Sequence, residues 1–349
     1  MNFLYNILSF LYKKLYTFID VYVRMDMRIR ICYKQHEEIR RDKMNEVLIL
    51  NQEEVKEILH LEKAIELVEE CYTEFNENKS VIYPAVRETV DEHEGIFGIK
   101  SSYLIDDKMI GLKAGGFWKN NMARKQKMNH QSTMVLFNAE TGEPTCLLDA
   151  NHITITRTAA AGAVAAKHLA KKDSQTVAII GSGVQAKVQL SGLLHQFSIK
   201  KVYVYSQATE AAEQWVTELI NQGISAENAK NAQEAVVNAD IVVTTTPSYT
   251  PVIKTSWLKQ GAHVNAIGSD TKGKNEVQMD KFIDKVVCDL WEQSSIMGEL
   301  QHGFAKESLY AEIGEITGLV KKGRETDEEI TMFDSTGISV QDMKVAAYV

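Results

Sequence analysis

A glycine-rich turn is the first part of the sequence whose residue types could do chemistry. It reads GSGVQA at residues 181–186 and follows the apolar run 175–180. The first glycine permits a tight turn, Gly183 lets the backbone approach a pyrophosphate, and Ala186 permits close helix–strand packing. N–H groups at the start of the following helix would bind the phosphate oxygens. In this strand–turn–helix context the pattern predicts a dinucleotide site contacted by Gly181, Gly183, Val184 and Gln185, with a structural glycine turn as the alternative.

The end of the next predicted strand bears on the choice between NAD and NADP. Ser206 and its neighbours supply neither an acid for the ribose hydroxyls nor an adjacent arginine for a 2′-phosphate. The cofactor is therefore expected to be NAD or NADP, with the choice left open. Thr245 and Gly268 end two later strands at the carboxyl edge, where cofactors lie in such sheets. A plain strand-to-loop transition is the alternative at Thr245.

Four charged residues stand where a core would prefer apolar ones. Arg87 follows residues 83–86, Lys113 ends an apolar run, Arg157 opens a stretch of small residues, and Asp270 follows residues 264–268. Taken singly, each is more often a surface charge or an ion-pair partner. Their meaning therefore depends on the longer motifs in which they stand.

The spacing of apolar residues predicts the elements that position these groups. Apolar positions at helical spacing predict a helix within 52–78, and short strand-like runs fall at 96–102, 109–114, 133–137 and 145–148. A helix is predicted over 157–170 from its small, helix-favouring residues. Strands at 175–180, 201–206, 241–246, 263–268 and 285–289 alternate with helices at 185–197 and 209–222. This alternation predicts a parallel, doubly wound sheet.

The predicted fold class is α/β, a Rossmann doubly wound parallel sheet with a second, mixed α+β domain. The dinucleotide-binding domain is expected over residues 161–306. The mixed domain is expected over 44–160, with the tail 307–349 returning to it.

Composition narrows the class of protein. The 349 residues carry a net charge of −8, which disfavours a nucleic-acid binder. Four scattered cysteines without a CxxC pair predict reduced thiols, no disulfide framework and no zinc site, and therefore a cytoplasmic protein without a metal.

Residues 1–43 do not match the rest of the chain. Residues 3–23 are apolar but contain Lys13, Lys14 and Asp20, whereas a membrane-spanning helix needs about 20 mostly uncharged residues. A membrane anchor is therefore disfavoured. The preferred interpretation is a disordered or non-native extension, and a peripheral membrane or partner-binding helix is the alternative.

Six motifs in sequence order resemble one known family. They are FNAETGEPTCLLD, TRTAAAGAVAAKHLA, GSGVQA, ADIVVTTTPS, NAIGSDTKGKNEV and GRETDEEITMFDSTGISVQD. From about residue 47 onward the chain resembles the ornithine cyclodeaminase and mu-crystallin family, with motifs most similar to those of archaeal alanine dehydrogenase and iminosuccinate reductase. The resemblance implies a Rossmann domain beside a substrate and dimerisation domain, a homodimer, and hydride transfer at the α-carbon of an amino acid.

The resemblance also implies roles for individual residues. Arg87, Lys113 and Arg157 would hold the substrate carboxylate, for which a planar guanidinium is well suited. Lys113 and Asp270 would be catalytic, with Asp270 as the acid–base group at the α-nitrogen. Thr133 would contact the substrate. On the cofactor side the resemblance implies Arg157, Thr158 and Ser335.

The expected function is NAD(P)-dependent interconversion of a small amino acid and its imino or keto acid. One alternative is ornithine cyclodeaminase, a lyase that recycles NAD internally, and another is a mu-crystallin-like binding protein. Lys100 would repel ornithine, and the basic segment 119–127 would favour an anionic side chain, although a solvated loop is the alternative for that segment. His130 is open to either a substrate contact or a structural role.

Overall fold

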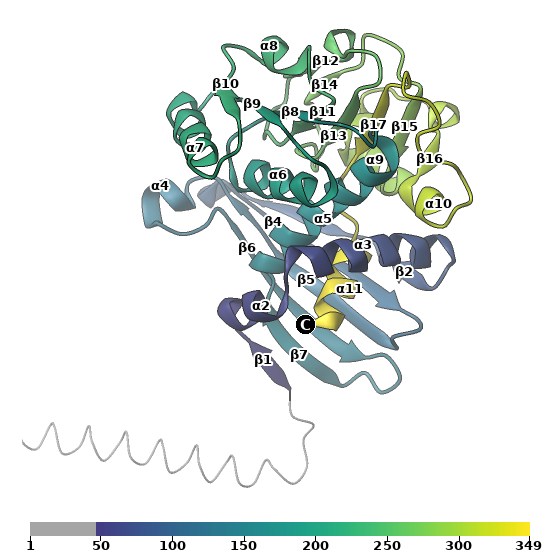
Figure 1. Cartoon of the computed structure of the whole chain (residues 1–349). Coiled ribbons are helices and arrows are strands. Elements are labelled where there is room, and N and C mark those ends of the chain that lie inside the picture. Colours follow the sequence, from purple (N-terminus) through teal and green to yellow (C-terminus); the bar gives the residue numbers. More distant parts are fainter. Residues whose placement is uncertain (1–46) are drawn as a thin grey trace, which may run out of the picture. The chain divides into compact units, whose positions relative to one another are not determined.

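The computed structural model describes residues 47–349, which form two large β-sheets with helices and a separate two-stranded pair (Figure 1). The predicted extension 1–43 lies outside the described residues. Within residues 47–349, no helix combines the length and the apolar character needed to cross a membrane.

The first sheet has seven strands and a mostly antiparallel order, β1-β7-β6-β5-β4-β2, with β3 also paired to β4. Only β1 joins its neighbour in parallel. The strands are β1 (Leu48–Leu50), β2 (Ser80–Ile82), β3 (Val86–Val90), β4 (Gly95–Leu104), β5 (Met109–Trp118), β6 (His130–Asn138) and β7 (Pro144–Asp149), and the 3-10 turn η1 (Asp91–His93) joins β3 to β4. The four predicted strands before residue 150 correspond to β4 to β7.

Helices cover one face of this sheet. They are α2 (Gln52–Ile58), α3 (Leu61–Asn76), α5 (Asn151–Leu169) and α11 (Ser339–Tyr348), while α4 (Asn121–Lys125) belongs to the β5–β6 connection. Successive side chains of a strand point to opposite faces, so that Leu148 of β7 is buried in the core whereas Leu147 is exposed. The sheet therefore has a covered inner face and an uncovered outer face.

The second sheet has eight strands, all parallel, in the order β10-β9-β8-β11-β13-β17-β15-β16. The strands are β8 (Thr176–Ile180), β9 (Lys201–Tyr205), β10 (Ala226–Asn228), β11 (Ile241–Thr244), β13 (His263–Ala266), β15 (Lys285–Cys288), β16 (Ala311–Glu312) and β17 (Thr331–Asp334). The helices and 3-10 turns between them are α6 (Val184–Gln196), α7 (Thr209–Asn221), α8 (Ala232–Val236), α9 (Trp291–Met297), α10 (Ile313–Thr317), η2 (Thr255–Trp257), η3 (Glu299–Gln301) and η4 (Lys306–Ser308). A separate parallel pair joins β12 (Ile253–Lys254) to β14 (Val277–Gln278). The predicted α/β class with a parallel Rossmann sheet is confirmed.

The tail of the chain differs from the expectation that residues 307–349 rejoin the first domain. β16 and β17 are strands of the parallel sheet, and β17 inserts between β13 and β15. All four residues of β17 are buried, which is typical of a strand covered on both faces. Within the tail, α11 packs on the inner face of the first sheet. The boundary at residue 307 was therefore wrong for β16 and β17.

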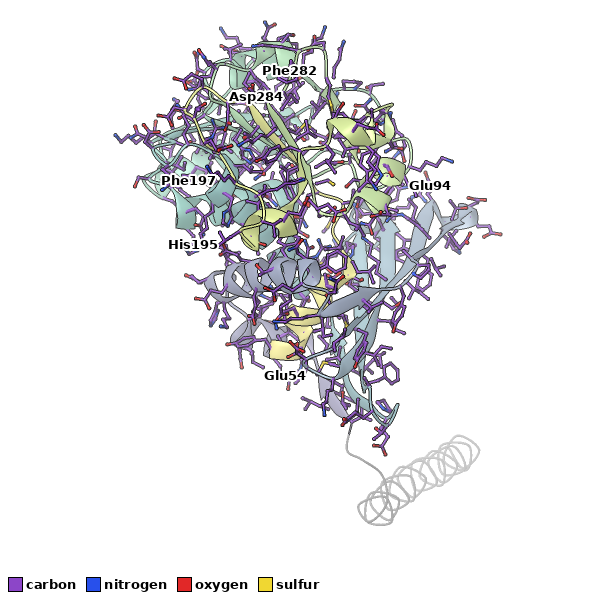
Figure 2. All side chains as sticks on the ribbon, turned by 90° about the vertical axis from the view of Figure 1, so that its right-hand side faces the viewer. Glu54, Glu94, His195, Phe197, Phe282 and Asp284 are labelled. Atoms are coloured by element: carbon purple, nitrogen blue, oxygen red, sulfur yellow. The ribbon has the colours of Figure 1, made fainter. Side chains whose placement is uncertain are left out.

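The two layers meet where α5 crosses α6. A Cβ built on Gly192 of α6 would lie 3.0 Å from the carbonyl oxygen of Ala159 and 3.2 Å from the Cβ of Ala163. Near the end of α6, His195 Nδ1 lies 3.7 Å from Glu62 Oε1 of α3 (Figure 2). The close approach at Gly192 sets the position of the glycine-rich turn relative to α5.

We expect Gly192→Val to destabilise the protein by about 1–3 kcal/mol, because added side-chain atoms overpack a tight helix crossing. Ser191→Val, at an exposed neighbouring position on the same helix, is the matched control and should leave the unfolding midpoint nearly unchanged. Urea unfolding followed by circular dichroism measures both variants. Equal midpoints for the two variants would contradict the role given to this crossing.

Candidate active site

The turn after β8 has the backbone geometry of a phosphate-binding loop. Gly181 has a φ of +121°, which L side chains rarely adopt, and a Cβ there would lie 2.5 Å from Oγ1 of Thr245. Gly183 is the N-cap of α6 and makes no side-chain cap, and a Cβ built on it would meet nothing within 4 Å. The first N–H groups of α6, at Val184 and Gln185, therefore begin a helix that no side chain caps, beside open space.

These residues fit a dinucleotide. An uncapped helix N-terminus offers N–H groups and the positive end of the helix dipole to a pyrophosphate. Within residues 47–349, the buried Oε1 of Gln185 has no hydrogen-bond partner. Ser206, directly after β9, accepts hydrogen bonds from Ser182 Oγ at 3.0 Å and from the Ala208 N–H at 3.2 Å. The turn could hold a pyrophosphate, and Ser206 stands where the ribose of the cofactor is expected.

Other cofactor-side candidates follow neighbouring strands of the same sheet. Thr245 follows β11, Gly268 follows β13 and Ser335 follows β17, and these strands are adjacent. A Cβ on Gly268 would collide with the carbonyl oxygen of Thr246 and lie 2.6 Å from the carboxylate of the buried Glu276, which accepts the Gly268 N–H at 2.7 Å. The carboxyl ends of parallel strands share one edge, and this edge therefore brings the three candidates together with the glycine-rich turn.

Thr158 belongs to α5, on the side of that helix that contacts α6. Its hydroxyl donates to the carbonyl oxygen of Thr154 within the same helix at 2.6 Å, and its own carbonyl oxygen accepts from Gln189 Nε2 at 2.7 Å. Thr158 therefore joins the two helices through a buried polar contact, and its role toward a cofactor stays a prediction.

The inner face of the first sheet carries the cationic candidates. Lys100 of β4 is directly opposite Lys113 of β5, and Arg87 of β3 is opposite Gly98, two residues before Lys100. Directly opposite residues of antiparallel strands share a face, as do residues two apart in one strand. Arg87, Lys100 and Lys113 therefore lie on one face, although they come from three strands.

A buried carboxylate joins Lys113 to Arg157. Asp342 Oδ1 accepts from Lys113 Nζ at 2.6 Å and from Arg157 Nε at 2.9 Å. The side chains of all three are at most 10% exposed. Arg157 Nη1 also donates to Gln341 Oε1 at 3.1 Å, and Lys113 Nζ to Thr154 Oγ1 at 3.2 Å. Lys113, Arg157 and Asp342 are called the buried triad below.

The loop after β17 packs against this triad. Gly337 has a φ of +71°, and a Cβ there would collide with the guanidinium of Arg157. Lys100 Nζ donates to the carbonyl oxygen of Gly337 at 2.6 Å, while the Gly337 N–H donates to the buried Asp289 at 2.6 Å. Only a glycine can pass this close to Arg157 with such a backbone, and this brings the second sheet to the triad.

The charged groups of the cluster shift one another's pKa values. Burial lowers the pKa of Lys113 to about 7 and that of Lys100 to about 8, with Arg157 lowering both further and Asp342 opposing the shift. Burial would raise the pKa of Asp342, but Arg157 and Lys113 hold it below its ordinary value. Burial lowers the pKa of His130 to about 4, so that this side chain is neutral at pH 7. Lys113 is therefore a group whose charge can change near neutral pH.

Asp270 lies on the other side of the cluster. Its Oδ1 accepts from Lys274 Nζ at 2.6 Å and from Thr271 Oγ1 at 3.1 Å. Thr271 Oγ1 in turn accepts from Arg87 Nη2 at 2.6 Å. The structure therefore brings together all four charged candidates from the sequence: Lys113 and Arg157 share Asp342, and Arg87 reaches Asp270 through Thr271.

The structure corrects the predicted role of Thr133. It is opposite Ala114, on the face away from Lys113, and its side chain is exposed on the outer face of the sheet. Ser132, one residue earlier, is buried on the inner face, and its Oγ lies 3.4 Å from Thr154 Oγ1. Neighbouring side chains of a strand point to opposite faces of the sheet, so the expected substrate contact at Thr133 was wrong.

Sequence reasoning missed Asp342 and Lys274. Asp342 ends the motif GRETDEEITMFDSTGISVQD, and Lys274 lies four residues after Asp270 in NAIGSDTKGKNEV. The spacing of four residues between opposite charges was a signal for Lys274. No local signal marked Asp342, because its partners are 185 and 229 residues away.

Residues 45–349 match the family described as "Ornithine cyclodeaminase/mu-crystallin family". The chain belongs to this family. The chain is similar to alanine dehydrogenase of Archaeoglobus fulgidus, with 38% identity over 313 residues that cover 87% of this chain and 94% of the relative. It is also similar to iminosuccinate reductase of Paracoccus denitrificans, with 31% identity over 305 residues that cover 86% and 94%. The family predicted from the motifs is confirmed.

Solved structures share the fold. An archaeal alanine dehydrogenase dimer with bound NAD superimposes with a TM-score of 0.81 at 38% identity, covering 86% of this chain and 95% of that chain. Thermococcus litoralis Δ(1)-pyrroline-2-carboxylate reductase, in complex with NADH and L-proline, also gives a TM-score of 0.81, at 30% identity and with coverage of 86% and 96%.

We expect Asp342→Asn to lower the free energy of unfolding by about 3–5 kcal/mol, because it leaves two buried cations without their anion. The loss should be larger at pH 5.5 than at pH 8. Without Asp342 the pKa of Lys113 falls below 7. The variant must then either bury an unpaired cation or give up the proton that the wild type keeps below pH 7, so the extra cost grows as the pH falls below 7 and is absent well above it.

Asp106→Asn is the control, since Asp106 lies on the surface, 3.9 Å from Lys79 in a solvent-screened pair. Urea unfolding at the two pH values measures both variants. A loss below about 1 kcal/mol in Asp342→Asn, or a loss that grows with pH, would show that the triad does not depend on this carboxylate.

Proposed function

We infer that this chain is an NAD(P)-dependent oxidoreductase that interconverts a small amino acid with its imino or keto acid. The observation that supports this most is the meeting of Arg87, Lys113, Arg157 and Asp270 in one cluster at the carboxyl edge that also carries the glycine-rich turn. The relatives named alanine dehydrogenase and iminosuccinate reductase support the same class of reaction.

The cofactor would be held by the turn at Gly181 and Gly183 and by the start of α6. When bound, the nicotinamide would accept or supply a hydride at the substrate's α-carbon. Solved relatives contain NAD or NADH, and Ser206 offers no charge that would select between NAD and NADP. Thr245, Gly268 and Ser335 follow the neighbouring strands and would line the rest of the cofactor cleft.

The substrate carboxylate would bind the cations of the inner face. Arg157 uses Nε and Nη1 for Asp342 and Gln341, and within residues 47–349 its Nη2 has no hydrogen-bond partner. Lys113 has three N–H donors, of which two are used by Asp342 and Thr154. Both cations therefore keep a donor for a substrate carboxylate, and Asp270 would stand at the nitrogen.

Lys100 argues against the lyase alternative. It is on the same face as Lys113 and opposite it, so a diamino acid such as ornithine would bring a second ammonium beside these cations. A monoamino acid or an anionic side chain avoids that repulsion. Ornithine cyclodeaminase activity is therefore less well supported than the oxidoreductase activity and is the second candidate.

A spectrophotometric panel tests the function. NADH and NADPH oxidation would be followed with pyruvate plus ammonia, oxaloacetate plus ammonia, Δ1-pyrroline-2-carboxylate and L-ornithine. We expect net oxidation with at least one imino acid, and proline formation from ornithine without net cofactor change would identify a lyase instead. Tight cofactor binding without turnover of any substrate would indicate a binding protein of the mu-crystallin type.

We expect Asp270→Asn to lower kcat by about 10²–10⁴-fold while NADH binding stays within about twofold, since a positioned ionisable group contributes on that scale. Steady-state kinetics and quenching of NADH fluorescence measure the two effects. Asp284→Asn controls for a general loss of aspartate charge, since Asp284 (labelled in Figure 2) directly precedes β15 and so lies at the opposite end of the parallel strands from the carboxyl edge. Unchanged kcat in Asp270→Asn would remove Asp270 from the mechanism.

We also propose that a second copy of the chain covers the outer face of the seven-stranded sheet. Apolar side chains from all seven of its strands point to that face: Ile49, Val81, Val86, Phe97, Ile99, Tyr103, Ile110, Leu112, Val135, Phe137 and Leu147. Of these, Leu147 is 37% exposed and Ile49 68%. A contiguous apolar patch of this kind is typical of a protein interface, and the archaeal relative is a dimer.

We also propose a cytoplasmic location, which is supported by the free thiols of Cys71, Cys146 and Cys288.

Leu147→Glu should weaken self-association at least tenfold, because it places a charge inside the proposed interface. Leu194→Glu on α6 is the matched control, since Leu194 is also 37% exposed but lies in the other layer. Sedimentation equilibrium measures both. A monomeric wild type, or equal dissociation constants for the two variants and the wild type, would refute the interface.

A further inference from the structure

Lys274 is the partner of Asp270 in the loop after β13. Its Nζ donates to Asp270 Oδ1 at 2.6 Å and to the carbonyl oxygen of Gly268 at 3.1 Å. The Lys274 N–H donates to the Thr271 carbonyl at 3.1 Å, and Ser269 Oγ donates to the Lys274 carbonyl at 3.0 Å. The Lys274 side chain is only 18% exposed. Its ammonium is therefore held in place by the loop and not by the ion pair alone.

The two oxygens of Asp270 are in different situations. Oδ1 accepts from both Lys274 and Thr271, and Thr271 is itself held by Arg87. No residue in the described part of the chain donates to Oδ2, and 44% of the side chain is exposed. Asp270 therefore presents one carboxylate oxygen to the cluster while its other oxygen is fixed by neighbours.

We propose that Lys274 is a positioning residue that keeps Asp270 as an anion, so that Asp270 binds the protonated, iminium form of the substrate and does not itself supply the proton. This inference rests on the function proposed above. Asp270, the expected acid–base group, would then act only as an anion during imine reduction.

The charges around Asp270 support an anion. Loss of water around the partly exposed Asp270 carboxyl would raise its pKa, but the charges of Lys274, Arg87 and Lys100 outweigh this and hold the pKa well below its usual range. A general acid must carry its proton at the working pH. With three cations around it, the Asp270 carboxyl carries no proton near neutral pH. It is instead suited to face a positively charged nitrogen.

In this mechanism the imine takes its proton from solvent before it binds. The imine nitrogen is protonated in solution and enters as an iminium, with its carboxylate facing Lys113 and Arg157 and its nitrogen facing Asp270 Oδ2. A hydride brings two electrons to the α-carbon, and the C=N π pair becomes the lone pair of a neutral amine. Water then protonates the amine to give the ammonium of the product, so that Asp270 ends the cycle in the state in which it began.

Three variants separate this role from a general effect of charge. Lys274→Met removes the cation, Lys274→Arg keeps it, and Lys272→Met removes an exposed cation from the same loop. If Lys274→Met does not fold, Lys274→Gln keeps a donor for Gly268 and removes the charge in the same way. Thermal unfolding shows whether each variant is folded.

The first readout is the pH profile of kcat/KM for reduction of Δ1-pyrroline-2-carboxylate, or of another imino acid reduced in the panel above. In the wild type the acid limb should lie below the accessible pH range. Lys274→Met should move it upward by about 1–3 pH units, the usual effect of losing an opposite charge at contact distance. Lys274→Arg and Lys272→Met should leave it in place. An acid limb that does not move in Lys274→Met, or moves equally in Lys272→Met, overturns the proposal.

The second readout needs no turnover. Aspartate labelled with ¹³C at the side-chain carboxyl is incorporated, and the resonance missing from Asp270→Asn identifies Asp270. Its titration should begin at clearly higher pH in Lys274→Met than in the wild type, and an ordinary aspartate titration in the wild type overturns the proposal. A wild type that reduces no imino acid refutes the proposed function and the iminium role with it, whereas this titration still decides whether Lys274 keeps Asp270 ionised.

Discussion

The buried triad of Lys113, Arg157 and Asp342 is the interaction on which the rest of the site depends. Two cations with side chains at most 10% exposed would be very costly to bury without an anion, and one oxygen of Asp342 serves both. The three residues come from β5, α5 and α11, which lie far apart in the sequence. The ion pair therefore forms only when the last helix has packed on the first sheet, so that the charge of the site and the completion of the fold depend on each other.

The parallel sheet supplies the second constraint. Its adjacent strands β8, β11, β13 and β17 end at one edge, where each following loop contributes a polar or glycine position. Three kinds of contact tie this edge to the cations beside it: the hydrogen bond from Arg87 to Thr271, the hydrogen bond from Lys100 to the carbonyl oxygen of Gly337, and the passage of Gly337 against the guanidinium of Arg157. Backbone groups and fixed side chains, and not flexible surface charges, thus decide how the two halves of the cluster face each other.

Much of this arrangement could be predicted from local sequence, and the remainder could not for definite reasons. The glycine-rich turn and the alternation of strands and helices are local patterns, and both were predicted. The choice between Ser132 and Thr133 depends on which face of β6 points inward, and a shift of one residue reverses that choice. The insertion of β17 between β13 and β15, and the pairing of Asp342 with Lys113, join segments that no local pattern relates.

Under the proposed function, the triad would also make binding of the substrate carboxylate sensitive to pH. Asp342 does not occupy all the donors of the two cations: among residues 47–349, Arg157 Nη2 has no hydrogen-bond partner, and Lys113 uses two of its three N–H donors. Asp342 would therefore stabilise the two cations and still leave them donors for a substrate carboxylate. Since burial lowers the pKa of Lys113 to about 7, a second carboxylate beside it would raise that pKa. Above neutral pH, binding of a carboxylate must then be accompanied by uptake of a proton at Lys113, and affinity must fall as the pH rises. The cation proposed to orient the substrate would thus also link substrate binding to the proton concentration.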